Sequence, residues 1–227
     1  MDPILLLDIP FHANVDALLR TVHVRPDSED AGRIRELAEE AQTIARPKGM
    51  YKAAYVEGRE EAAVVVDGIR LTSRVLRVNL GDAYRVFPFV ATCGRELEAW
   101  ANGIDDLLES FWVGAIMESA LAAAYDYVAR HLHEHLQPGS TATMNPGSLA
   151  DWPMSEQTQL FALLGDPLQA VGVELTDSFL MRPIKSVSGL HFATDTHFEN
   201  CQLCPRERCP GRRAPYDKDL FARQYLA

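Results

Sequence analysis

Hydrophobic positions along the chain change their period several times, and each change marks a predicted element. Residues 15–24 and 28–46 carry apolar side chains at helical spacing, and the second run opens on Ser28, a typical N-cap, and stops before Pro47. Residues 52–58, 62–71 and 84–94 are rich in Val, Tyr and Phe and are bounded by glycines, which predicts strands with a hairpin in the second segment. We therefore expect two surface helices followed by a sheet.

The second half of the pattern predicts a long buried helix and further strands. Residues 94–102 and 105–136 read as two helices, and the alanines of the second allow other elements to approach it closely. Ser155 is expected to cap a helix that ends at Gly165, and residues 168–193 read as short strands joined by turns. This order favours an α+β fold, with an antiparallel or mixed curved sheet and a long central helix. Periodicity ends near Thr194, so we expect a domain over residues 1–194 and a cysteine-containing appendage over residues 195–227.

Charge and composition exclude some partners. The chain has 47% hydrophobic and 24% charged residues and a formal net charge of −10, so phosphate backbones and anionic lipids are repelled. No nucleic-acid or membrane partner is expected, although the tail holds a basic patch at Arg206, Arg208, Arg212 and Arg213. No apolar run approaches the length needed to span a bilayer and the opening residues lack a basic region, so the predicted location is cytoplasmic.

Three cysteines close together predict a metal centre in the tail. Cys201, Cys204 and Cys209 stand in a segment that can turn tightly at Pro205, and in a reducing compartment such thiols favour metal binding over disulfides. The fourth ligand is either Cys93, which suits an iron-sulfur cluster, or His197, which suits structural zinc. Direct redox use of the thiols is a further alternative.

Two irregular segments have the composition of a small-molecule site. The Pro-Gly turn in "TMNPGSLADWP" exposes backbone amides, and the Ser-Val-Ser-Gly run in "LTDSFLMRPIKSVSGLHF" combines hydroxyls with a glycine that allows close approach. We expect both segments to form one wall of a pocket. The candidate binding residues are Asn145, Pro146, Gly147, Ser148, Asp151, Ser186, Val187, Ser188, Gly189 and His191, with Glu118 and Glu156 as weaker candidates.

These segments resemble the activation (reactivation) domain of cobalamin-dependent methionine synthase. The match is densest at residues 175–192, where that family has Leu-Thr-Glu-Ser, Met, Pro and Ser-Val-Ser-Gly. "NPGSLADWPMSEQTQLFALL" is similar to the family's Pro-Gly-Tyr loop and the helix after it, and "FPFVATCGRELEAW" to its Thr-x-Gly turn. The resemblance covers about residues 87–192 and implies a free-standing relative with the activation-domain fold.

The resemblance also implies a function. In that family the domain docks over a corrinoid, binds S-adenosylmethionine and supports reductive methylation of cobalt that has become inactive Co(II). For this chain it implies an accessory protein that reactivates a cobalamin-dependent methyltransferase, with S-adenosylmethionine as ligand and the cobalamin on a partner protein. An iron-sulfur cluster in the tail would then supply or relay the electron.

Three positions depart from the family's pattern. Thr143 and Ser148 stand where the family has the arginine and tyrosine that hold S-adenosylmethionine, and His191 replaces another tyrosine. Loss of an arginine that pairs with a carboxylate removes about 1.5–3 kcal/mol of binding free energy. These departures support an alternative function, a non-catalytic module that binds a partner protein and uses zinc only as a structural element.

Overall fold

The computed structural model describes residues 2–195, 198–209 and 211–226 and confirms the predicted α+β architecture. Its sheet is antiparallel throughout and is built around β6 (Arg85–Thr92), which pairs with β2, β3 and β10. The strand order is β1 (Ile4–Leu6), β2 (Lys48–Tyr51), β6, β3 (Ala54–Arg59), β4 (Ala63–Val66) and β5 (Ile69–Thr72). β10 (Ser186–Ala193) lies beside β6 and carries β7 (Thr141–Met144) on its other edge.

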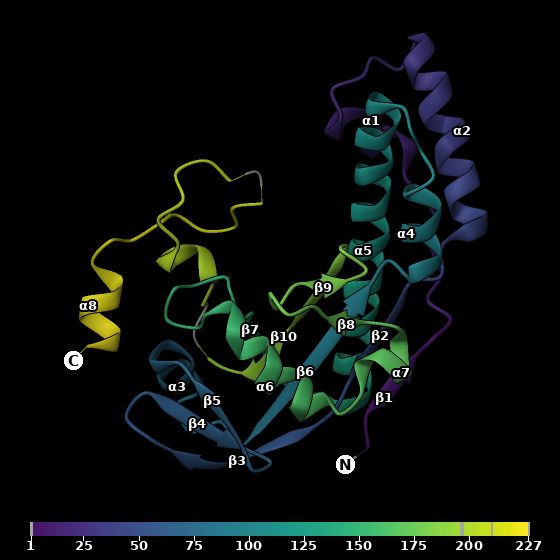
Figure 1. The fold of residues 1–227 in the computed structure, drawn as a ribbon. Coiled ribbons are helices and arrows are strands. Elements are labelled where there is room, and N and C mark those ends of the chain that lie inside the picture. The colour runs from purple at the N-terminus through teal and green to yellow at the C-terminus, as the bar shows by residue number, and fades with distance from the viewer. Residues whose placement is uncertain (1, 196–197, 210, 227) are drawn as a thin grey trace.

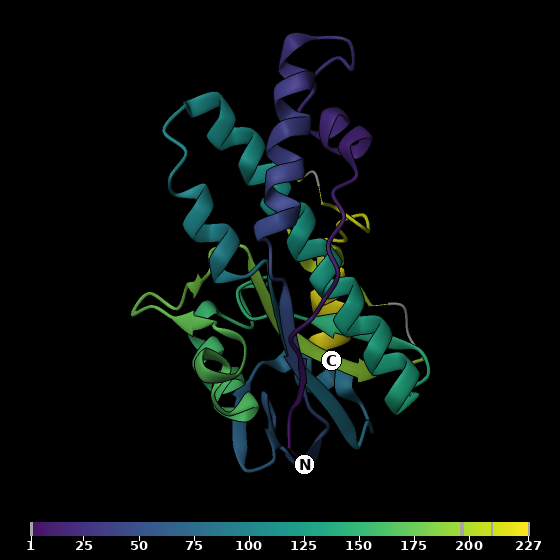
Figure 2. The same cartoon turned by 90° about the vertical axis from the view of Figure 1, so that its right-hand side faces the viewer.

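One face of the sheet is covered by α5 (Leu107–Leu136), which continues beyond the sheet into a helical cluster with α1 (Val15–Thr21), α2 (Glu29–Ile44) and α4 (Arg95–Ala101) (Figures 1 and 2). By length and composition α5 is apolar enough to cross a bilayer, so the expectation that the sequence holds no such run was wrong. Its buried residues, however, recur at helical spacing and pack into the protein core: Trp112, Val113, Ile116, Met117, Ala120, Ala124, Val128 and Leu132.

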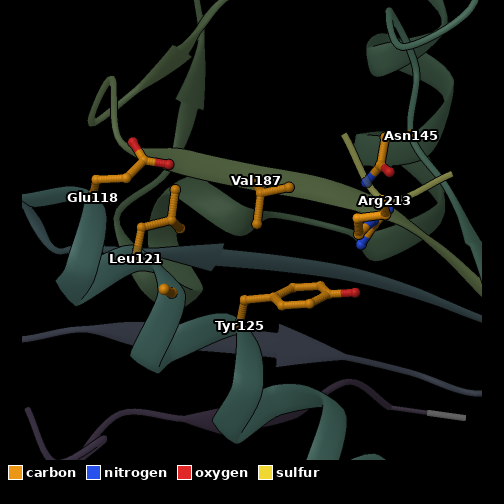
Figure 3. Close-up of a pocket in the computed structure, with 7 residues that line it drawn as sticks. Glu118, Leu121, Tyr125, Asn145, Val187 and Arg213 are labelled. Carbon is orange, nitrogen blue, oxygen red and sulfur yellow. The ribbon is translucent and has the colours of Figure 1, made fainter. Parts of the chain in front are cut away.

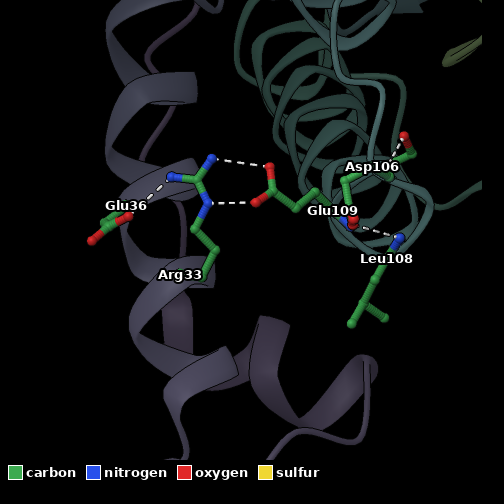
Figure 4. Close-up of polar contacts among 6 residues, drawn as sticks. Arg33, Glu36, Asp106, Leu108 and Glu109 are labelled. Carbon is green, nitrogen blue, oxygen red and sulfur yellow. Dashed lines mark hydrogen bonds and ion pairs between the residues drawn. The ribbon is translucent and has the colours of Figure 1, made fainter.

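Figure 4 shows how α2 is joined to the first turn of α5. The Arg33 guanidinium donates to both carboxylate oxygens of Glu109, with Nε–Oε1 and Nη2–Oε2 distances of 2.7 and 2.9 Å, and it also contacts Glu36. This guanidinium holds the pKa of Glu109 below its usual range. Asp106 caps the same turn by accepting from the backbone N–H of Leu108 and Glu109. The start of α5 is therefore fixed in relation to α2.

Several short elements complete the fold. α6 (Gln157–Leu164) ends at Gly165 as the sequence predicts, but it is entered through a 3₁₀ turn, η1 (Met154–Glu156), so Ser155 is not its N-cap. The strands β8 (Glu174–Leu175) and β9 (Met181–Arg182) form a separate hairpin. Six helices or strands lay outside our expectations: β1, β2, α3 (Arg74–Leu80), β7, α7 (Pro167–Val171) and α8 (Leu220–Tyr225).

The segment predicted as an appendage returns to the protein core. Its described part contains a 3₁₀ turn, η2 (Asn200–Leu203), and a final helix, α8 (Leu220–Tyr225). Phe198 and Tyr225 are buried in the same hydrophobic cluster as Leu76 and Leu80 of α3. The Tyr225 hydroxyl donates to Oδ1 of Asn79 at 2.8 Å. These contacts place η2 beside the loop that follows β7.

Candidate functional site

The alternation of β10 decides which of its residues face α5. Successive side chains of a strand point to opposite faces of a sheet. Val187 lies against Leu121 and Ala122 of α5, whereas the buried Ser188 hydroxyl donates to Oε1 of Gln157 in α6 at 2.6 Å. The serine-rich run therefore presents its valine, rather than Ser188, to the α5 side.

Gly189 allows the loop after β7 to close onto β10. A Cβ atom at this position would lie 2.5 Å from Nδ2 of Asn145 and 2.6 Å from the Met144 carbonyl oxygen, which is closer than real contacts allow. The Asn145 amide uses this space to donate to the Ser188 carbonyl at 2.8 Å. The predicted meeting of the Asn-Pro-Gly loop with the Ser-Val-Ser-Gly strand is thus present in the structure.

Asn145 also connects this wall to the tail. Its Nδ2 is oriented toward the Ser188 carbonyl, which can only accept a hydrogen bond, so its Oδ1 faces Asn200. Nδ2 of Asn200 donates to that Oδ1 at 3.2 Å. A single side chain thus joins β10, the β7 loop and η2.

Two neighbouring cavities open where these segments meet α5, and together we name them the α5–β10 groove. The first, of about 270 Å³, lies between Glu118, Leu121, Ala122 and Tyr125 of α5 and Val187 of β10. Figure 3 shows Glu118 at one end of this cavity and Asn145 and Arg213 together at the other. The second, of about 280 Å³, continues from Asn145 and Arg213 to the following residues: Ser148, Asn200, Cys201, Cys204 and Gly211.

His191 lies behind the groove in an aromatic stack. Its ring packs against those of Phe89 and Tyr125, with centroid distances of 4.5 and 5.9 Å, and these two rings contact each other at 5.5 Å. Its Nδ1 is hydrogen-bonded to the Thr143 hydroxyl at 2.7 Å, so two positions that depart from the family's pattern contact each other. Burial lowers the pKa of His191 to about 4, and the ring is therefore neutral near pH 7. It supports Tyr125, which lines the groove.

The four cysteines do not come together as a metal centre. Cys93 is fully buried among helices α2, α4 and α5, and burial raises the pKa of its thiol to about 12, which disfavours the thiolate that a metal binds. Cys201 and Cys204 line the second cavity instead. In the described parts of the chain no three His, Cys, Asp or Glu side chains are grouped as a metal site, and His197 lies outside those parts. The described donors therefore give no support for the predicted iron-sulfur cluster, and the zinc alternative with His197 stays a prediction.

The other predicted site residues either line the groove, form the turn after β7 or bind neighbouring elements. Asn145, Ser148 and Val187 line the groove. Pro146 and Gly147 form the turn, in which the Gly147 N–H donates to the Trp152 carbonyl at 2.7 Å with φ of +84°. Asp151 accepts from Ser73 and from the Val75 N–H at the start of α3, and Ser186 donates to Thr92.

Sequence reasoning missed part of the lining. Tyr125 repeats the helical spacing of Glu118, Leu121 and Ala122, so the α5 face carried a signal that was not used. Asn200 and Arg213 carried none, because their approach to Asn145 depends on how the tail folds back.

Comparisons with known proteins find one family with a similar sequence segment and a solved structure with a similar fold. Residues 141–202 match the family model described as the vitamin B12 dependent methionine synthase, activation domain. A crystal structure of the MetH reactivation domain bound to AdoHcy superposes with a TM-score of 0.61 at 16% sequence identity, covering 88% of this chain and 81% of that one. Among curated protein sequences, none matches significantly.

The matched residues contain β7, the loop after it and β10. These segments form the wall of the groove in which the Asn145 side chain packs over Gly189. The predicted resemblance is confirmed: this chain has the fold of the MetH reactivation domain, and its residues 141–202 match the activation domain family of vitamin B12-dependent methionine synthase.

Proposed function

We propose that the α5–β10 groove binds a nucleoside thioether or sulfonium of the S-adenosylmethionine type, and that the protein thereby supports reductive reactivation of a corrinoid on a partner protein. The observation that carries this proposal is the contact of Asn145 with Gly189, which forms one wall of the groove from residues inside the segment that matches the activation domain family. The structurally similar reactivation domain was crystallised with AdoHcy, a ligand of this class.

The groove's chemistry suits such a ligand. Tyr125, Leu121 and Val187 offer aromatic and aliphatic surface for a purine or a thioether chain. Asn145 and Arg213 supply polar groups at the far end. In the proposed reaction this chain binds and orients the methyl donor, while the cobalt chemistry belongs to the partner's corrinoid. The described cysteines do not form a metal group, so we assign the electron to an external donor.

A larger apolar groove adjoins the site and provides a docking surface for the corrinoid protein. It has a volume of about 720 Å³, runs between α1 and the N-terminal half of α5, and shares Glu118 and Ala122 with the first cavity. Phe111, with 60% of its surface exposed, stands on its edge. A partner seated there would lie directly beside the proposed ligand.

Isothermal titration calorimetry with AdoHcy and S-adenosylmethionine tests the ligand. Ala122→Phe places a ring in the groove without disturbing the core, because Ala122 is exposed. We expect this variant to lose binding and Ala222→Phe, an exposed alanine of α8, to retain it. No heat with either ligand at millimolar concentration would contradict the proposal.

Reactivation is tested separately, with a corrinoid protein held in the Co(II) state, S-adenosylmethionine and a chemical reductant. Formation of methylcobalamin, followed by its visible absorbance, should require this chain and should fall with Ala122→Phe. Ligand binding without any methylation would support the alternative of a non-catalytic binding module.

A further inference from the structure

The second cavity contains a charged residue that comes from outside the matched segment. Arg213 lies beyond residues 141–202, yet it lines both cavities and stands beside Asn145 (Figure 3). We propose that Arg213 binds the carboxylate of the ligand's amino-acid end, so that the second cavity is an amino-acid subsite formed by the tail. This inference rests on the proposed function, because it assigns one end of the same ligand.

The tail holds Arg213 in place from several directions. Its backbone N–H donates to the Cys201 sulfur at 3.4 Å, and Nη1 of Arg212 donates to the Cys201 carbonyl at 3.2 Å. Nη2 of Arg213 pairs with Oε2 of Glu199 at 2.9 Å. A guanidinium has five N–H donors in a planar fork, so contact with Glu199 leaves donors for a second carboxylate.

Asn200 indicates that the subsite takes a hydrogen-bond donor as well. Only 7% of its surface is exposed, it lines the second cavity, and its Nδ2 is used by Asn145. Its Oδ1 is buried and has no hydrogen-bond partner among the described residues. Buried acceptors are nearly always satisfied in proteins, and a ligand ammonium is a donor of the right kind. An α-amino acid offers both the ammonium and the carboxylate.

The charges of the groove also orient the ligand. Glu118 stands at the opposite end, 2.7 Å from Nζ of Lys185, and its carboxylate would repel another carboxylate there. The amino-acid end is therefore favoured beside Arg213, with the nucleoside against Tyr125.

The test compares AdoHcy with 5′-methylthioadenosine, which keeps the nucleoside and thioether but lacks the amino-acid end. By calorimetry, the unaltered protein should bind AdoHcy about tenfold to a hundredfold more tightly, the effect expected of a charge-assisted contact. Arg213→Ala should lower the AdoHcy affinity toward that of methylthioadenosine, because it removes the carboxylate contact but not the contact with Asn200, and should leave the affinity for methylthioadenosine unchanged. Arg208→Ala removes the same charge from an exposed position of the tail and should change neither affinity.

The outcomes separate the two proposals. Equal affinities for AdoHcy and methylthioadenosine in the unaltered protein would overturn the amino-acid subsite and leave the nucleoside site standing. An Arg213→Ala variant that binds AdoHcy as tightly as the unaltered protein would overturn the role of Arg213. If neither compound binds, the proposed function fails and the subsite with it. Circular dichroism of each variant excludes loss of folding as the cause.

Discussion

Asn145 is the residue on which the geometry of the candidate site depends most. Its one amide donates to β10 and accepts from η2, while its side chain occupies space that exists only because residue 189 is glycine. Neither contact could be predicted from the local sequence, since Asn145 and Ser188 are far apart in the chain. The turn in this loop was predictable from the sequence, because a Pro-Gly pair favours a turn.

The cysteines should differ sharply in reactivity. Hydrogen bonds from the backbone N–H of Arg213 and Ala214, with the Arg213 and Arg212 charges, lower the pKa of the Cys201 thiol, whereas burial raises that of Cys93 to about 12. Thiolates alone are alkylated at appreciable rates. Iodoacetamide at pH 8, followed by peptide mass spectrometry, should therefore modify Cys201 and spare Cys93. Labelling of Cys93 at a comparable rate in the folded protein would contradict this, and urea-unfolded protein provides the fully labelled control.

His191 should make stability depend on pH. Its pKa is lowered by burial to about 4 in the folded state and is close to 6.5 when unfolded, so between these values only the unfolded chain binds the proton. Stability should fall as pH falls from about 6.5 toward 4, by about 3 kcal/mol. Urea unfolding at pH 7 and pH 5 measures the change. The His191→Asn variant has no titrating group at this position, so its unfolding free energy should fall less between pH 7 and pH 5 than that of the unaltered protein. Part of the pH dependence should remain in the variant, because the pKa of His131 is also lowered.

At the scale of elements, the sequence predicted what local pattern determines. Helix α2 begins after Ser28 as its capping signal indicates, and α5 matches its predicted range closely. β7 was missed because "TATM" is short and follows a Pro-Gly pair, and its strand character comes from pairing with β10. α3 was missed although Ser73 is a regular N-cap, because "RVLRVNL" is rich in β-branched residues and also fits a strand.

The crossing of the β7 loop over β10 should not tolerate a methyl group. Gly189→Ala brings a Cβ against Asn145, the Met144 carbonyl and Phe89, so we expect a loss of about 1–3 kcal/mol in unfolding free energy. Gly32→Ala, in α2, meets no atom within 4 Å and should stabilise the protein by about 0.5–1 kcal/mol. Urea denaturation of both variants measures the difference, and equal stabilities would show that the crossing is not tightly packed.

The docking of α8 should depend on one buried hydroxyl. Tyr225 is 1% exposed and donates to Asn79, whose amide lies near the Met144 sulfur. Tyr225→Phe leaves the Asn79 oxygen without its donor, at a cost of about 1–3 kcal/mol in unfolding free energy. Tyr216→Phe, at a position 46% exposed, should change stability little. Equal effects of the two substitutions, measured by urea denaturation, would show that the tail does not pack on α3 in solution.

At the scale of the whole molecule, the groove is assembled from three segments that are distant in sequence. Residues between Glu118 and Tyr125 of α5 form one wall, and Asn145, Ser148 and Val187 form the second. The tail closes the far end with Asn200, Cys201, Cys204, Gly211 and Arg213. Helix α1 lines the larger groove, and neither α1 nor α2 lines these two cavities. A ligand in the groove would contact all three segments at once.

Ligand binding should therefore protect a discontinuous set of residues. A ligand that binds only the folded state, at a hundred times its dissociation constant, stabilises that state by about 2.7 kcal/mol. The tail has few buried side chains and should gain most, because its local opening breaks the contacts between Asn200, Arg213 and the ligand. Hydrogen exchange with AdoHcy should slow at residues 198–209 and 211–214 and around residues 141–148, with little change in α2. Slower exchange in α1 and the N-terminal half of α5, with no change in the tail, would place AdoHcy in the larger groove instead. Methylthioadenosine should protect the α5 wall of the two smaller cavities and leave the tail unprotected.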